Sequence, residues 1–262
     1  MRSATLRRFK YTFGADVIRA LVRFTPFLDG NARPPNAINF AGAGDFEAGG
    51  NKTVALMQKH AGLKENDDVL DIGSAIGRNA LALHRVMGDD ISYEGFDIVA
   101  YGVEWSRKTF AKLSGQYNFS HANIWNSFYN PRGRLKPAEF TFPYTDGRFD
   151  ISVATSVYTH MRKDAVAQYL TQTARVTKRG GRAYFTVFGH DGVNEKSKFS
   201  FTHKGDGDWI EDLSEPAMAV AYDLDWVREY LTALGAVKVD VHTGYWRGTK
   251  GLDFQDIVVA HF

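Results

Sequence analysis

Residues 69–79 read Val-Leu-Asp-Ile-Gly-Ser-Ala-Ile-Gly-Arg-Asn: a short apolar run, an acid, two glycines and the start of a helical pattern. In doubly wound α/β folds, an acid at the carboxyl end of a buried strand, followed by glycines that let the backbone approach a ligand, opens the ligand crevice. A plain strand-to-helix turn can have the same composition, because turn glycines are common. The stretch alone therefore predicts either a ligand loop or a turn.

Strand and helix patterns alternate after this stretch. The segments that read as strands are 69–72, 91–96, 117–122, 149–155, 182–188, 237–243 and 254–262. The segments with helical periodicity between them are 78–87, 99–113, 164–176 and 225–234. Strands that alternate with helices form parallel sheets, so we predict an α/β fold: a Rossmann-like, doubly wound, mostly parallel sheet of about seven strands.

The chain before the sheet begins with a basic amphipathic segment, residues 1–24. Its apolar residues recur at helical spacing: Leu6, Phe9, Phe13, Val17, Leu21 and Phe24. Its basic residues oppose only Asp16: Arg2, Arg7, Arg8, Lys10, Arg19 and Arg23. Such a helix can pack its apolar stripe on its own domain, or it can lie on an anionic membrane surface. Both alternatives stay open at this stage.

Residues 40–50 form a glycine-rich stretch that carries Phe40 and Phe46, before a helix predicted over 53–60. A loop with aromatic anchors is typical of a lid, and it is equally typical of a linker. We therefore predict an N-terminal helical and lid extension over residues 1–50 and a main domain over 51–262. Two segments rich in helix and strand breakers or without a clear period, 125–148 and 190–222, are predicted as insertions.

The composition is that of an ordinary globular protein. The 262 residues are 44% hydrophobic and 24% charged, and the formal net charge of +2 gives no reason to expect a nucleic-acid partner. The chain has no cysteine, which excludes disulfides, thiolate metal ligands and a cysteine nucleophile. It has no apolar run of membrane-spanning length and no continuous secretory apolar region. We expect a cytoplasmic protein, with contact to the inner membrane face through residues 1–24 as an open alternative.

Three polar residues follow three successive predicted strands: Asp71, Asp97 and Asn123, each 26 residues after the one before. The carboxyl ends of parallel strands line one crevice in an open α/β sheet. Asp97 lies 20 residues beyond Gly77, where a carboxylate can accept hydrogen bonds from both hydroxyls of a ribose. The side-chain amide of Asn123 offers a donor and an acceptor to an adenine edge. The pattern indicates a nucleoside site.

The glycine pattern does not fit a dinucleotide or a Walker loop. Ala75 and Arg78 stand where the second and third glycines of a dinucleotide fingerprint would be. No glycine-lysine-serine or glycine-lysine-threonine tripeptide follows Gly73. The nucleoside is therefore expected to belong to another cofactor.

The stretch 69–78 resembles the first motif of class I S-adenosylmethionine-dependent methyltransferases, with Ala75 in place of the middle glycine. Residues 93–98, 120–124, 149–155 and 179–182 resemble the later motifs of that family, and the final helix and two strands resemble its closing antiparallel pair. Four further stretches are similar to a bacterial small-molecule subgroup of these methyltransferases: 44–47, 129–134, 155–161 and 255–259. The resemblance implies S-adenosyl-L-methionine as cofactor and an antiparallel final strand. The residues that it implies for cofactor binding are Asp71, Gly73, Ser74, Ala75, Gly77, Asp97, Ile98, Asn123, Ile124 and Thr155.

The chemistry expected beyond the cofactor is in-line transfer of a methyl group to a small-molecule, glycan or lipid-linked acceptor. His160, just past the fourth predicted strand, is the candidate general base for O-methylation; the alternative is that it bonds a backbone carbonyl and orients its loop. Phe46, Trp125, Tyr129 and Tyr158 are candidate acceptor contacts, or packing residues.

Two further functions stay open: a cofactor-binding interaction module without turnover, and a membrane-peripheral lipid methyltransferase. The histidine spacing does not indicate a metal site, so we expect no metal. The sequence does not indicate an oligomeric state.

Overall fold

The computed structural model describes residues 13–24, 32–42 and 44–262. The chain forms two compact units, Met1–Arg134 and Leu135–Phe262. The predicted division at residue 50 is not tested by these units, although a helix runs across it.

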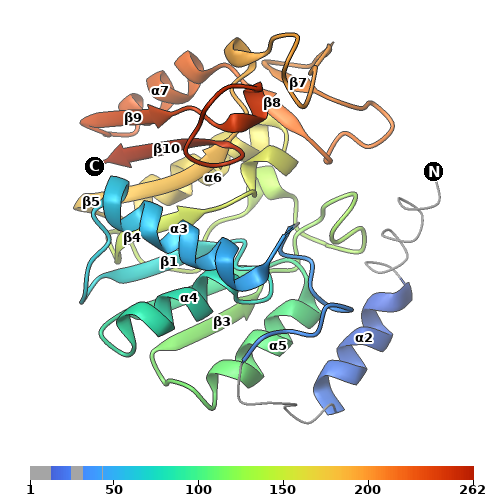
Figure 1. Cartoon of the computed structure of the whole chain (residues 1–262), viewed down its shortest axis with the longest axis vertical. Helices are drawn as coiled ribbons and strands as arrows, with labels where there is room; N and C mark the ends of the chain where they lie inside the picture. The colour runs from blue at the N-terminus through green and yellow to red at the C-terminus, as the bar shows by residue number, and fades with distance from the viewer. Residues whose placement is uncertain (1–12, 25–31, 43) are drawn as a thin grey trace. The chain divides into compact units, whose positions relative to one another are not determined.

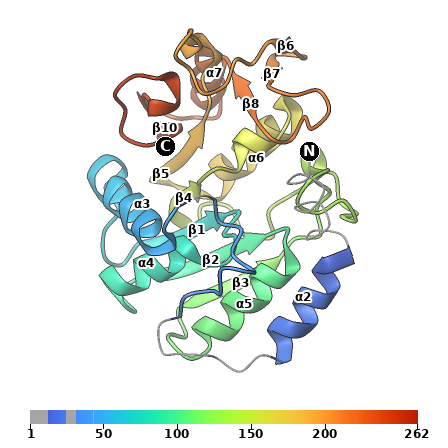
Figure 2. The same ribbon diagram turned by 45° about the vertical axis from the view of Figure 1, so that its right-hand side comes forward.

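The described part of the unit Met1–Arg134 carries three parallel strands and four helices. The strands are β1 (Asp68–Ile72), β2 (Ser92–Asp97) and β3 (Tyr117–His121), with β2 paired to both neighbours. The helices are α2 (Phe13–Phe24), α3 (Phe46–Ala61), α4 (Arg78–Met87) and α5 (Ala100–Phe110). Helix α3 runs alongside α4, and α2 lies beside α5, in both Figure 1 and Figure 2.

Helix α3 begins at Phe46, not at the predicted Thr53, so the expectation of a loop over 46–50 is wrong. Asp45 caps the helix, because its side chain accepts a hydrogen bond from Ala48 N at 2.8 Å. A Cβ on Gly50 would lie 2.8 Å from Arg78 O. The glycine that suggested a loop therefore lets α3 approach α4, and Phe46 is buried in the first turn of the helix.

Helix α2 is held against α5 by polar contacts and one buried side chain. Lys108 Nζ donates to Val22 O at 2.6 Å, and Arg19 lies 3.6 Å from Glu104. Val22 is buried, whereas Val17 and Leu21 of the predicted apolar stripe are each 61% exposed. The packing alternative is therefore wrong for these two residues; Leu6 and Phe9 lie outside the described residues.

The unit Leu135–Phe262 carries the second half of the fold. Its helices are α6 (Lys163–Val176) and α7 (Leu224–Ala233). Its longer strands are β4 (Phe149–Ala154), β5 (Thr177–Val187), β9 (Lys238–His242) and β10 (Asp256–His261). Strands β4 and β5 are parallel, and β10 lies antiparallel between β5 and β9 (Figure 1). Short 3₁₀ turns are η1 (Pro137–Glu139), η2 (Tyr158–His160), η3 (His190–Gly192) and η4 (Tyr245–Arg247).

The larger sheet has the strand order β3-β2-β1-β4-β5-β10-β9. The pairs β1–β2, β2–β3 and β4–β5 are parallel, whereas β10 is antiparallel to both β5 and β9. The predicted Rossmann-like, mostly parallel sheet with an antiparallel final strand is confirmed. Strand β5 starts at Thr177, earlier than the predicted Arg182, because the strand continues through Gly180 and Gly181.

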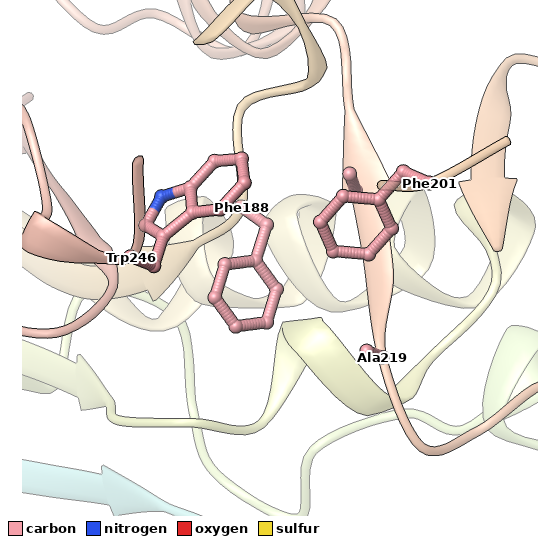
Figure 3. Close-up of a cluster of buried hydrophobic side chains, with 5 residues drawn as sticks. Phe188, Phe201, Ala219 and Trp246 are labelled. Atoms are coloured by element: carbon pink, nitrogen blue, oxygen red, sulfur yellow. The ribbon is translucent and has the colours of Figure 1, made fainter. Parts of the chain in front are cut away.

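Residues 190–222 contain regular structure that the sequence did not reveal. The strands β6 (His203–Lys204), β7 (Asp208–Ile210) and β8 (Val220–Tyr222) form a second antiparallel sheet. A buried cluster supports it: Phe188, Phe201, Ala219, Ala221 and Trp246. The ring of Phe188 lies 5.2 Å from that of Trp246 and 5.4 Å from that of Phe201 (Figure 3). Aromatic packing, not strand length, therefore holds this insertion.

None of the helices in the described ranges is both long enough and apolar enough to span a membrane.

Candidate functional site

The loop between β1 and α4 has an unusual backbone. Gly73, Ala75 and Gly77 have φ of 72°, 52° and 82°, all in the left-handed region. Gly73 N and Ser74 N donate to Phe96 O at 2.9 and 3.0 Å, so the loop folds over the end of β2. The left-handed conformation costs a residue with a Cβ about 1–2 kcal/mol, which Ala75 bears and a glycine would not.

Two glycines outside the loop give it room. A Cβ on Gly95 of β2 would lie 2.8 Å from Ser74 Cβ, and a Cβ on Gly102 of α5 would lie 2.8 Å from Ala75 O. The loop thus rests directly on a strand and on a helix. Sequence reasoning missed both residues, although a glycine inside a strand is a known signal of close backbone approach.

Asp97 ends β2 and receives the loop. Its Oδ2 accepts from Ala75 N at 2.8 Å, and its Oδ1 accepts from Val99 N at 2.7 Å. Burial raises the pKa of Asp97 to about 6, although the N–H groups of Val99 and Ala75 favour the charged form. Each carboxylate oxygen keeps a further lone pair, so the group can also accept hydroxyl donors.

Asp71 is buried behind the loop. Its carboxylate accepts from Tyr93 OH at 2.7 Å and from Asn79 Nδ2 at 3.3 Å. Burial, with a smaller contribution from the charge of Asp97, raises the pKa of Asp71 to about 7. The structure therefore places this predicted cofactor residue in a network that ties β1 to β2 and α4. The partners Tyr93 and Asn79 were not foreseen.

We expect Asp71→Asn to stabilise the protein at about pH 8. A folded pKa near 7, above the unfolded value of 3.8, means that the folded state holds a proton that the unfolded state loses. The stability of the wild type therefore falls as pH rises from about 4 to about 7, by roughly 4 kcal/mol for this group. Urea unfolding at about pH 5 and about pH 8 measures this. The same pH dependence in both proteins would contradict it.

The donors and acceptors around the loop fit a nucleoside. Ser74 Oγ is buried, and it has no hydrogen-bond partner among the described residues. The carboxylate of Asp97 can accept from ribose hydroxyls. Asn123, half-buried after β3, belongs to a turn held by Arg134 N, which donates to Asn123 O at 2.9 Å. Ser74, Asp97 and Asn123 would hold the nucleoside part of such a cofactor.

The remaining predicted cofactor residues of this unit flank that set. Ile124 is buried, and its carbonyl accepts from Asn130 Nδ2 at 2.9 Å. Ile98 is half-buried, with its carbonyl 3.2 Å from His121 Nε2. Apolar side chains at these two positions can cover the faces of a base.

The segment before α3 lies against the loop region. Arg78, the first residue of α4, donates to Ala41 O. The ring of Phe40 meets Tyr101 edge-on at 5.3 Å, and the absence of a Cβ on Gly102 makes room for this ring. Residues 40–42 are thus docked beside the loop. Both the lid and the linker remain predictions.

The predicted acceptor residues differ in how far their side chains are exposed. Trp125 is 49% exposed, and Tyr129 is half-buried with its ring edge-on to Phe128 at 4.9 Å. Tyr158 is fully buried, with its hydroxyl 3.3 Å from Thr173 Oγ1. Tyr158 and the buried Phe46 therefore pack in the interior. The acceptor role of all four residues stays a prediction, and exposure favours Trp125 and Tyr129.

His160 lies in η2, beyond β4 and after the half-buried Thr155. Its Nδ1 is 2.8 Å from Ala217 O. A carbonyl only accepts, so we assign the proton to Nδ1, which leaves the lone pair on Nε2. Burial lowers the pKa of His160 below its ordinary value, although the bond to Ala217 opposes this. The ring is therefore neutral at neutral pH.

Within residues 13–24, 32–42 and 44–262, no three His, Asp or Glu side chains are grouped as a metal site would require.

Comparison with known families places this architecture. Residues 69–181 match the family model described as a methyltransferase domain. The carboxy-S-adenosyl-L-methionine synthase of Desulfotalea psychrophila is 28% identical over 141 residues, which span 53% of this chain and 56% of that protein. This chain thus matches only about half the length of that curated relative.

Two solved structures share the fold along most of the chain. A Burkholderia thailandensis 1,6-didemethyltoxoflavin-N1-methyltransferase with bound S-adenosylhomocysteine has a TM-score of 0.52 at 16% identity, over 99% of this chain and 88% of that one. The cyclase SpnF has a TM-score of 0.57 at 16% identity, over 94% and 95%. These identities are low, so the likeness concerns the fold.

Proposed function

Because residues 69–181 match the methyltransferase-domain family model, we propose that the chain is a class I S-adenosylmethionine-dependent methyltransferase that transfers a methyl group to a small-molecule, glycan or lipid-linked acceptor. The observation that carries the proposal is the site at the end of β2. There Asp97 holds the loop through Ala75 N, beside the buried hydroxyl of Ser74 that lacks a partner among the described residues.

We propose that Asp97 accepts hydrogen bonds from both ribose hydroxyls and that the side-chain amide of Asn123 hydrogen-bonds to the adenine edge. S-adenosylmethionine supplies a methyl group on a positively charged sulfur. Because Gly95 and Gly102 have no Cβ, the loop packs directly on β2 and α5. In this proposal that packing positions the loop backbone to contact the cofactor. In this proposal Asp71 acts indirectly, because its bonds to Tyr93 and Asn79 hold the loop base.

His160 is proposed as the general base for an acceptor hydroxyl. As the acceptor oxygen bonds to the methyl carbon, the carbon–sulfur bond breaks and S-adenosylhomocysteine leaves. The hydroxyl proton moves to His160 Nε2, while Nδ1–H stays bonded to Ala217 O. This bond serves both readings of His160, since it orients the ring and also fixes the tautomer that a base needs. Trp125 and Tyr129 are the proposed acceptor contacts.

We expect His160→Ala to lower turnover by roughly 100- to 10,000-fold at saturating cofactor, because a positioned base contributes about that much. Transfer of a radioactive methyl group from S-adenosylmethionine into the small-molecule and lipid fractions of a cell extract measures it. His203→Ala, which removes an exposed imidazole of β6, is the matched control. Turnover equal to that of the wild type would end the general-base role.

A cofactor-binding module without turnover is the second candidate. The chain shares its fold with a cyclase, so the fold by itself does not require methyl transfer. Calorimetric titration with S-adenosylmethionine and with S-adenosylhomocysteine, followed by the extract assay, separates the two. Binding with no labelled product in any fraction would support the module.

A membrane-peripheral lipid methyltransferase is the third candidate function, and the exposed Val17 and Leu21 of α2 favour it. Apolar side chains next to arginines suit an anionic lipid surface. Salt-sensitive binding to phosphatidylserine vesicles, lost on deletion of residues 1–24, would support this acceptor class. Equal sedimentation of both proteins with the vesicles would oppose it.

A further inference from the structure

Ser156, in the segment that follows β4, has a strained backbone. Its φ is 57°, in the left-handed region, although it is not a glycine. This conformation costs about 1–2 kcal/mol and persists only where the surroundings impose it. Ser156 is exposed, so the strain does not serve to bury its side chain.

A closed ring of hydrogen bonds imposes this conformation. Ser156 N donates to Thr186 Oγ1 at 2.7 Å, and Thr186 Oγ1 donates to Gln255 Oε1 at 2.5 Å. Gln255 Nε2 then donates to Ser156 Oγ at 2.9 Å, which closes the ring. Thr186 lies in β5 and Gln255 directly precedes β10, so two strands hold one exposed serine.

The other end of the segment is fixed as well. Tyr222 OH, from β8, lies 2.8 Å from Tyr158 O and 2.5 Å from Met161 O. His160 is tied to Ala217. The segment from Ser156 to Met161 is therefore held from β5, from the residue before β10 and from the 190–222 insertion.

The direction of these bonds leaves one donor available. Ser156 Oγ accepts from Gln255 Nε2, so its own proton can point elsewhere. Among the described residues no acceptor is recorded for that proton. The exposed hydroxyl accepts from the half-buried Gln255, and the backbone N–H of the same serine is held by the buried Thr186, so the hydroxyl is pre-organised to donate to a ligand.

We propose that Ser156 binds the methyl acceptor, by donating a hydrogen bond to an oxygen atom of the acceptor. Gln255 and Thr186 are the positioning residues that aim this hydroxyl. The inference rests on the proposed function, because it assigns the specificity of the same transfer. It selects acceptors that carry a second oxygen, such as a carboxylate, a carbonyl or a neighbouring hydroxyl.

Ser156→Gly is the sharpest variant, because glycine adopts the left-handed backbone without strain and removes only the hydroxymethyl group. Labelled-methyl transfer is measured over a dilution series of the extract fraction that takes up label from the wild type. We expect the apparent KM for the fraction to rise roughly 10-fold, while the Kd for S-adenosylhomocysteine stays unchanged. The control is Ser200→Gly, which removes an exposed hydroxyl bonded to Glu211 in the same unit.

Gln255→Glu tests whether Gln255 orients the Ser156 hydroxyl or only stabilises the fold. The new carboxylate still accepts from Thr186, but it lacks the N–H that Gln255 donates to Ser156 and accepts a hydrogen bond from the serine hydroxyl instead. We expect the same rise in KM with an unchanged urea midpoint, whereas a purely structural role would leave KM unaltered. An unchanged KM in both variants overturns the inference while the proposed function stands. Absence of transfer by the wild type overturns the proposed function, and the inference with it.

Discussion

Replacing Asp97 with alanine is expected to weaken the binding of S-adenosylmethionine by roughly 100- to 10,000-fold. In the proposed site the change removes the acceptor for the ribose hydroxyls, and it also releases Ala75 N, which lies 2.8 Å from the carboxylate. Hydrogen bonds to a charged group are worth about 1.5–3 kcal/mol each, and two of them give about 3–6 kcal/mol. Calorimetric titration at neutral pH measures the loss.

The matched control for Asp97 is Asp68→Ala, at the amino end of β1. It removes a carboxylate from the opposite end of a neighbouring strand, so it should leave the affinity within about threefold of the wild type. The pKa of about 6 adds a pH test: affinity should fall as pH decreases below about 6, because protonated Asp97 accepts fewer hydrogen bonds. An Asp97→Ala variant that binds like the wild type would refute the ribose role.

Asp256→Ala is expected to lower the free energy of unfolding by about 3–5 kcal/mol. Asp256 is fully buried at the start of β10, and Arg247 donates to it through Nε at 2.9 Å and Nη2 at 3.0 Å. Trp246 Nε1, Gly189 N and Gly244 N donate to the same carboxylate at 2.9, 2.8 and 2.7 Å. Alanine would leave a buried guanidinium and three N–H groups without their acceptor.

Urea unfolding followed by circular dichroism tests this change. The control is Asp240→Ala on β9, whose half-buried carboxylate pairs with Lys238 at 2.7 Å and should contribute less than about 1 kcal/mol. If both variants unfolded at the same urea concentration, Asp256 would not be the anchor of this half of the chain.

The sheet could be predicted because its strands are buried on both faces. Val69, Leu70 and Ile72 are almost fully buried, and such strands read as continuous apolar runs. Asp71, Asp97 and Asn123 are equally spaced because one helix and one strand separate the carboxyl end of each strand from that of the next. These signals are local, so a single sequence carries them.

The start of α3 could not be predicted, because its glycines serve a contact between helices. Gly50 reads as a loop residue until Arg78 O is placed 2.8 Å from where its Cβ would be. The strands β6 and β8 have only two and three residues, too few for a period to show. Packing of Phe201 and Trp246 decides their fold, and it joins distant parts of the chain.

Some residues of the candidate site could be predicted from the sequence, and others could not. Asp97, Ser74 and Asn123 follow from a local motif, so the sequence indicates them. Ser156 and Gln255 are 99 residues apart, and only the folded chain brings their side chains to 2.9 Å. The carbonyl that fixes the tautomer of His160 lies 57 residues away in an insertion without sequence periodicity. No pattern within one segment could reveal these partners.

The most direct test of the account is the transfer of a radioactive methyl group from S-adenosylmethionine to the small-molecule and lipid fractions of a cell extract by the purified full chain. We predict a labelled product with the wild type and, at subsaturating cofactor, none above background with Asp97→Ala. A wild-type chain that binds the cofactor in calorimetry but labels no fraction would contradict methyl transfer as its function.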